Sequence, residues 1–142
     1  MTDQTETRER YPDGVLKVHG IGRLGRNPEM RYTPGGKAVL NMNVAITLRT
    51  STPEGFKTGT LWAHITVWEA LAETCNRWLA KGSRIYFEGR LEFNPETGSP
   101  EVFTRSDGTP GTRLEITAHE IRFLGGGEAN GQDPAEEQIE FA

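Results

Sequence analysis

Aromatic or polar side chains alternate with apolar ones along residues 61–68, and the rings of the first set can stack on flat ligands. The set with two indoles, an imidazole and a hydroxyl comprises Trp62, His64, Thr66 and Trp68. The other set is apolar and comprises Leu61, Ala63, Ile65 and Val67. Because successive side chains of a strand point to opposite faces, this segment is predicted to be a half-buried β-strand whose apolar side enters the core. Exposed rings on a sheet suit nucleobases, which all have a π-face; burial against a second sheet or a partner subunit is the alternative.

Other polar and aromatic residues could serve the same surface. Asn41 and Asn43 share one face of a predicted strand over residues 38–46, where they would either contact bases and phosphates or be merely solvated. Phe56 lies in a predicted long loop over residues 47–60, and it could clasp nucleic acid or fold back onto its own sheet. Phe103 lies in a second predicted loop, over residues 94–112. The cations expected to neutralise phosphates are Lys17, Arg31, Arg49, Lys57, Arg90 and Arg105.

The charge is divided unevenly along the chain. The formal net charge is -4, but residues 125–142 hold five carboxylates and no Lys or Arg. Residues 15–57 hold seven basic and two acidic side chains. A basic half and an acidic tail are therefore predicted to share one chain, and the basic half is compatible with nucleic-acid binding.

Several classes of protein are disfavoured by composition. A chain of 142 residues with 17 Gly, 8 Pro and 35% hydrophobic residues suggests one small, turn-rich domain. We expect no membrane span, no export signal and no disulfide, since there is a single Cys, and we expect a cytoplasmic setting. The three His residues have no spacing typical of a metal site or a catalytic triad, so no metal, no cofactor and no enzymatic activity are expected.

The predicted elements are five strands and one helix. The strands cover residues 15–24, 38–46, 61–68, 84–93 and 113–124, with a bulge expected near Ala118 and His119. The helix covers residues 69–81, and its inward face is formed by Leu71, Cys75, Trp78 and Leu79. Cys75 is expected to be buried and unreactive. A helix between strands 3 and 4 of an all-β chain is the element order of the OB-fold, a five-stranded Greek-key barrel that binds oligonucleotides or oligosaccharides.

Three regions follow from these elements. Residues 1–13 are predicted to be a flexible lead-in, residues 14–124 the barrel, and residues 125–142 a disordered acidic tail. The tail ends in carboxylates mixed with two apolar residues, a pattern that predicts docking to a basic, apolar pocket of a partner protein. Its candidate contact residues are Glu136, Glu137, Ile139, Glu140 and Phe141. A tail that only aids solubility is the alternative.

Three blocks of the sequence resemble the bacterial single-stranded DNA-binding protein family. GRLGRNPEMRY (residues 22–32) resembles the family pattern G-x-L-x-x-D-P-E-x-R-Y, and KGSRIYFEGRL (residues 81–91) resembles its K-G-s-x-v-x-v-E-G-x-L block. EIRFL (residues 120–124) resembles its closing strand, and Trp62 and Trp68 fall where the family has aromatic residues. Asn27 replaces the family's Asp, the aromatic after the second strand is absent, and Glu140 with Ala142 departs from the family's Pro-Phe tip.

The resemblance implies an OB-fold that forms homotetramers and wraps single-stranded DNA without sequence preference. It also implies that the tail recruits replication and repair proteins. On this interpretation Trp62 and Trp68 stack on bases, with Phe56 or Phe103 assisting from loops. The alternative is an OB-fold module for protein interaction or replication restart that binds DNA weakly.

Overall fold

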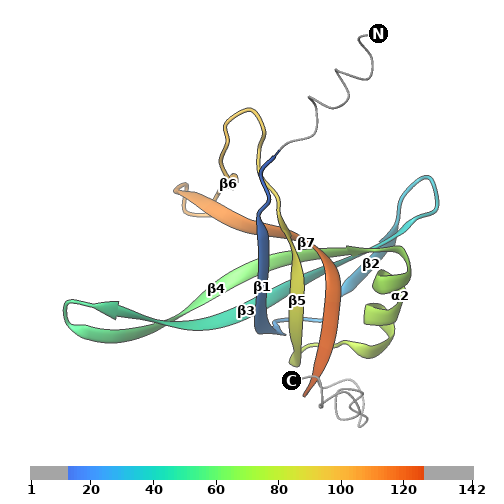
Figure 1. The fold of residues 1–142 in the computed structure, drawn as a ribbon, viewed down its shortest axis with the longest axis horizontal. Coiled ribbons are helices and arrows are strands. Elements are labelled where there is room, and N and C mark those ends of the chain that lie inside the picture. The colour runs from blue at the N-terminus through green and yellow to red at the C-terminus, as the bar shows by residue number, and fades with distance from the viewer. Residues whose placement is uncertain (1–12, 127–142) are drawn as a thin grey trace.

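A closed barrel of five long strands forms the body of the molecule (Figure 1). The computed structural model describes residues 13–126. The elements run β1 (Lys17–Leu24), β2 (Glu29–Tyr32), β3 (Ala38–Thr52), β4 (Gly55–Trp68), α2 (Glu69–Trp78), β5 (Ser83–Leu91), β6 (Glu101–Thr104) and β7 (Pro110–Gly126). The hydrogen-bonded order is β1-β5-β7-β4-β3, and pairing of β1 with β3 at Arg23 and Leu24 closes the barrel. The OB-fold prediction, with its helix between the third and fourth long strands, is confirmed.

Alternating apolar residues fill the barrel, as the period of the strands requires. The largest fully buried side chains are Leu40, Met42, Ile65, Ile85, Ile116, Val44, Val67 and Cys75. Helix α2 packs against this core through Ala72 and Cys75, and Trp78 lies half-buried beside it. Burial raises the pKa of the Cys75 thiol to about 12, which agrees with the expectation of an unreactive cysteine. The helix ends at Trp78, three residues earlier than predicted.

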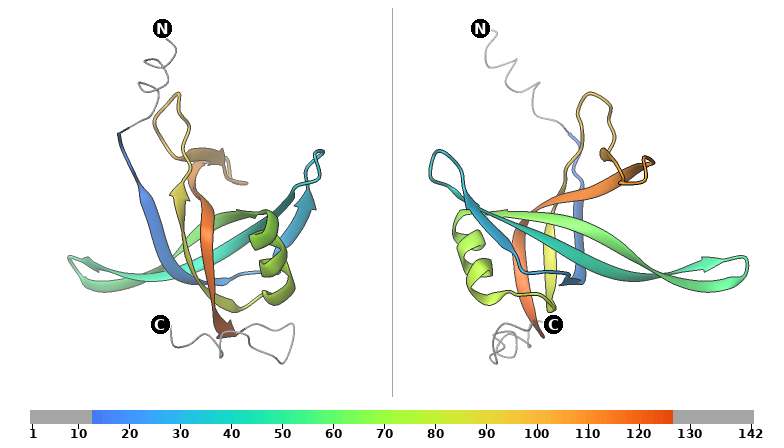
Figure 2. Two further views of the ribbon diagram at one scale, coloured as in Figure 1. Left: turned by 45° about the vertical axis from the view of Figure 1, so that its right-hand side comes forward. Right: turned by 180° about the vertical axis from the view of Figure 1, so that it is seen from behind.

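The predicted loop over residues 47–60 is wrong, because this segment is a regular hairpin. Strands β3 and β4 stay paired from Val39 opposite Trp68 to Thr52 opposite Gly55. Their outer ends, residues 47–60, project from the barrel as a two-stranded arm, which is visible in Figure 1 and from behind in the right panel of Figure 2. The arm leaves the core after Ile46, so Leu61 is 43% exposed rather than buried as expected. Ala63, Ile65 and Val67 do enter the core.

The second predicted loop, residues 94–112, also contains strand structure. The short strand β6 pairs with the start of β7, and together they form a hairpin beside the barrel (Figure 2). The predicted bulge is confirmed, since Glu88 pairs with Glu120 while Gly89 pairs with Ala118, which leaves His119 as the extra residue. β7 continues to Gly126, two residues past the predicted end. Among residues 13–126, no helix has the length and apolar character needed to cross a bilayer.

Candidate nucleic-acid interface

The two indoles singled out in the sequence lie exposed on the outer face of the β3–β4 ribbon. Trp62 is 54% exposed and Trp68 is 41% exposed, so neither ring is sealed inside the barrel. Trp62 lies opposite Ala45 and Trp68 opposite Val39, both of which are smaller side chains. The rings therefore rise above their cross-strand neighbours and leave a face on which a flat ligand can stack.

The backbone of Gly25 packs closely against the Trp62 ring. A Cβ built on Gly25 would come within 2.6 Å of Cζ3 and 2.8 Å of Cη2 of the indole. Only a residue without a side chain permits this approach. The turn between β1 and β2 therefore positions Trp62, although Gly25 lies far from it in the sequence.

Asn41 and Asn43 lie between the two indoles, as the interpretation of the strand face required. Asn41 pairs with Thr66 and Asn43 with His64 across the two strands. The hydroxyl of Thr66 donates to Oδ1 of Asn41 at 3.0 Å. With the Asn43 amide oriented so that its oxygen faces Arg26, Nε and Nη2 of that arginine donate to it at 3.0 and 2.7 Å. These amides are thus fixed in position rather than loosely solvated.

A polar groove of about 500 Å³ runs beside these amides. Its lining comes from β2, β3, β4 and the segment that joins β1 to β2, and comprises Arg26, Asn27, Pro28, Glu29, Arg31, Asn41, Asn43 and His64. Arg31 also forms an ion pair with Glu29, at 3.3 Å. The groove presents guanidinium and amide donors, which are the groups that bind phosphate oxygens and base edges.

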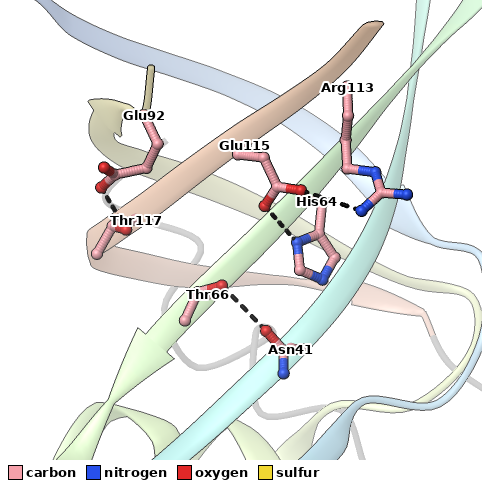
Figure 3. Close-up of polar contacts among 7 residues, drawn as sticks. All are labelled: Asn41, His64, Thr66, Glu92, Arg113, Glu115 and Thr117. Carbon is pink, nitrogen blue, oxygen red and sulfur yellow. Dashed lines mark hydrogen bonds and ion pairs between the residues drawn. The ribbon is translucent and has the colours of Figure 1, made fainter. Parts of the chain in front are cut away.

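A carboxylate on β7 contacts both an imidazole and a guanidinium at this face (Figure 3). Oε1 of Glu115 lies 2.7 Å from Nδ1 of His64, and its Oε2 lies 3.4 Å from Nη1 of Arg113. The contacts arise because β4 and β7 run parallel with His64 opposite Glu115. Glu115 therefore orients both the imidazole and the guanidinium.

Phe103 faces the Trp62 region from the β6–β7 hairpin. A pocket of about 340 Å³ is lined by Arg26, Asn43, Trp62, His64, Phe103, Thr112 and Arg113. The guanidinium carbon of Arg113 lies 4.9 Å from the centre of the Phe103 ring, within the range of a cation–π contact. Arg105 lies farther from that ring, at 5.9 Å, and donates a hydrogen bond to the carbonyl of Pro110.

The arm carries a second aromatic–cation pair. The guanidinium carbon of Arg49 lies 4.3 Å from the centre of the Phe56 ring, and Phe56 is 68% exposed. In the β3–β4 register Phe56 is an even number of residues from Trp62, so both belong to the same face of the ribbon. Lys57 belongs to the opposite face, paired with Thr50.

Lys17 and Arg90 lie away from the indoles. They pair with each other across β1 and β5, and neither strand borders β4. Lys17 forms an ion pair with Glu88 at 3.5 Å, and Arg90 with Glu92 at 2.8 Å. The structure therefore does not bring these two predicted cations to the Trp62 face. The predicted tail residues Glu136, Glu137, Ile139, Glu140 and Phe141 lie outside the described residues.

Three residues of the face were not singled out from the sequence: Arg26, Arg113 and Glu115. Because Leu114 and Ile116 alternate inward, Arg113 and Glu115 must point outward. That alternation could have identified them as surface residues. Their position beside β4 could not be deduced, because it depends on a parallel pairing of distant segments.

Comparison with known proteins assigns the chain to a protein family. Residues 15–124 match the model of the single-strand binding protein family. The chain belongs to this family. Asn27 stands where the family pattern has Asp, and its side-chain oxygen accepts a hydrogen bond from the backbone N–H of Lys81 at 2.8 Å. In this member of the single-strand binding protein family, the first two sequence blocks therefore contact each other directly.

Relatives and solved structures agree with that assignment. A single-stranded DNA-binding protein of Neisseria meningitidis serogroup A is 40% identical over 123 residues, covering 85% of this chain and 67% of that protein. Single-stranded DNA-binding protein 1 of Chlorobaculum tepidum is 33% identical over 129 residues, covering 83% of this chain and 70% of that protein. A deletion mutant of the single-stranded DNA-binding protein from Thermus aquaticus aligns with a TM-score of 0.60 at 30% identity, covering 84% of this chain and 53% of that one.

The fold alone is further supported by a more distant structure. The small single-stranded DNA-binding protein from Streptomyces coelicolor aligns with a TM-score of 0.60 at 22% identity, covering 76% of this chain and 93% of that one.

Within residues 13–126, no group of three or more His, Cys, Asp or Glu side chains is arranged to hold a metal ion.

Proposed function

We propose that this protein binds single-stranded DNA with little dependence on sequence, by stacking bases on Trp62 and Trp68 and neutralising phosphates with nearby arginines. The decisive feature is the pair of exposed indoles on a ribbon face whose amides and guanidinium groups are held in place. Membership of the single-strand binding protein family supports the same function.

The free energy of base stacking favours binding of single-stranded over duplex DNA. Stacking on an aromatic side chain contributes about 1–3 kcal/mol per base. Bases in a duplex are already stacked, so they cannot use Trp62 or Trp68 without first being unpaired. Phosphate contacts by Arg26 and Arg31 would release counterions, and affinity should therefore fall as salt rises.

Tryptophan fluorescence tests this proposal. Oligothymidylate should quench the emission and duplex DNA should quench it weakly. Trp62→Ala and Trp68→Ala should each weaken binding by about 1–3 kcal/mol. Trp78→Phe is the matched control, because Trp78 packs against the core and should leave affinity unchanged. Unchanged affinity in Trp62→Ala would count against the proposal.

A second function, that of a protein-interaction or replication-restart module with weak DNA binding, makes different predictions. It predicts a shallow salt dependence and little quenching by any oligonucleotide. The exposed apolar side chains of Val15, Leu16 and Ile21, at and just before β1, could serve such an interaction. The same titration, repeated at low and high salt, separates the two functions.

We also propose that the protein forms a homo-oligomer, most simply a tetramer. We further propose that it acts in the cytoplasm in DNA replication, recombination and repair, and that it has no enzymatic activity. Residues 17–22 of β1 pair only with β5 among the described strands, and Ile21 beside this free edge is 45% exposed. An edge with exposed apolar residues favours pairing with another chain. Light scattering would report the mass, and incubation of labelled oligonucleotide with added Mg²⁺ would report any cleavage.

The acidic tail is proposed to bind replication and repair proteins through Glu136, Glu137, Ile139, Glu140 and Phe141. Its charge and two apolar residues suit a basic, apolar pocket. A protein truncated after residue 126 should keep its affinity for single-stranded DNA and lose those partners in pull-down experiments. Retention of the partners by the truncated protein would contradict a docking role.

A further inference from the structure

The pocket between Trp62 and Phe103 differs from the open face beside Trp68. Aromatic rings reach it from two separate elements, Trp62 from β4 and Phe103 from the β6–β7 hairpin. Its volume of about 340 Å³ is within the range of small-molecule sites, so a single nucleobase can enter it.

The hydrogen-bonding groups around this pocket are mostly donors. Arg26 and Arg113 carry only N–H donors. The oxygen of the Asn43 amide accepts hydrogen bonds from Arg26, so the NH₂ group of Asn43 is the part of that amide left to bind a ligand. Glu115 occupies Nδ1 of His64, which leaves Nε2 as the single ring nitrogen for a ligand. Thr112 adds a hydroxyl, which can donate or accept.

We infer that this pocket accepts one base of the bound strand and prefers guanine over adenine there. The inference rests on the proposed binding of single-stranded DNA and adds to it a base preference at one position. Guanine presents two neighbouring acceptors, O6 and N7, on one edge, and an arginine fork binds both. Adenine has N7 and an amino group on that edge, and the amino group would face the donors of Arg26 and Arg113.

Arg113 is suited to this readout by its two fixed contacts. Glu115 holds its Nη1 at 3.4 Å, and Phe103 lies 4.9 Å from its guanidinium carbon. An arginine that is already oriented loses less conformational freedom when it binds a base. Adenine and guanine stack almost equally well, so a difference between them reports hydrogen bonding rather than stacking.

The test compares oligothymidylates of about 15 nucleotides that carry one central purine. The guanine oligonucleotide should bind the full-length protein at least about fivefold more tightly than the adenine one. Hypoxanthine, which keeps O6 and N7, should retain the advantage, and 7-deazaguanine, which lacks N7, should lose it. Equal affinities for guanine and adenine would overturn the inference and leave the proposed function intact. Failure of every oligonucleotide to bind would overturn both.

Variants locate the preference in this pocket. Arg113→Lys keeps the positive charge but not the fork, so it should abolish the guanine advantage while oligothymidylate still binds. Phe103→Leu should reduce it. Arg77→Lys, on the exposed face of α2, is the matched control and should keep the full advantage. A guanine advantage that survives Arg113→Lys and Phe103→Leu undiminished would show that another site makes the distinction.

Discussion

The indole of Trp62 lies over the backbone of Gly25, so close that a Cβ on Gly25 would approach Cζ3 to 2.6 Å. Gly25→Ala should therefore push the ring aside without disturbing the core, because a side chain is easier to move than backbone. We expect affinity for oligothymidylate to fall by up to about tenfold, part of the 1–3 kcal/mol of a stacked base. Fluorescence titration measures this. Gly59→Ala, with nothing within 4 Å of its Cβ, is the control and should bind normally.

Glu69 adopts a left-handed backbone conformation, with φ of 60°, directly after Trp68. This conformation is costly for a residue with a side chain and easy for glycine. Glu69→Gly should raise the free energy of unfolding by about 1 kcal/mol in urea denaturation. Glu73→Gly, within α2, should instead lower it by about 1 kcal/mol. A loss of stability in Glu69→Gly would refute the strain at this position.

A hydrogen bond on β5 should make stability depend on pH. Tyr86 donates to Glu88 at 3.1 Å, and this bond lowers the pKa of Glu88 below its usual value of 4.5. A lowered carboxyl pKa stabilises the fold above pH 4.5, and that stability is lost as pH falls through the lowered value. Tyr86→Phe should thus be less stable than the parent at pH 7, with the difference shrinking towards pH 3. Urea denaturation at several pH values, with Tyr32→Phe as the control, measures this; a difference independent of pH would contradict it.

The Cys75 thiol should resist alkylation in the native protein. Its burial raises its pKa to about 12, so almost no thiolate exists at pH 8. Iodoacetamide should modify Cys75 only after denaturation, which mass spectrometry can follow over time. Rapid modification of the folded protein would mean that α2 opens readily.

The arm should contribute to binding through Phe56. Phe56→Ala removes the exposed ring that stacks on Arg49, on the same face of the ribbon as Trp62. We expect a loss of about 1–3 kcal/mol on oligonucleotides long enough to reach the arm, and a smaller loss on short ones. Leu48→Ala is the control, because Leu48 is exposed on the opposite face of the same arm. Equal effects of the two substitutions would indicate that the arm contributes no specific stacking.

Local alternation was sufficient to predict the outward-facing side chains of residues 62–68, although it also placed Leu61 in the core, where the structure does not have it. Trp62, Trp68, Asn41 and Asn43 share one face because the period of a strand is two, and that needs no knowledge of the fold. The contact of Glu115 with His64 could not be predicted in this way, since it depends on which strands become neighbours.

The arm was missed for a different reason. A long loop was predicted over residues 47–60, whereas in the structure Thr52 pairs with Gly55 and Pro53 and Glu54 form a two-residue turn. The flanking segments are rich in threonine, whose branched Cβ favours strands even where no apolar residue alternates. Hydrophobic periodicity detects half-buried strands, and an arm exposed on both faces has none.

The two sides of the arm are hydrogen-bonded to each other from Thr47 opposite Thr60 to the turn, and the core ends at Ile46. Matched pairs could therefore be inserted or deleted there, each changing the length by about 3.3 Å, while the barrel keeps every buried contact. The length of the arm can thus change without altering the packing that stabilises the barrel.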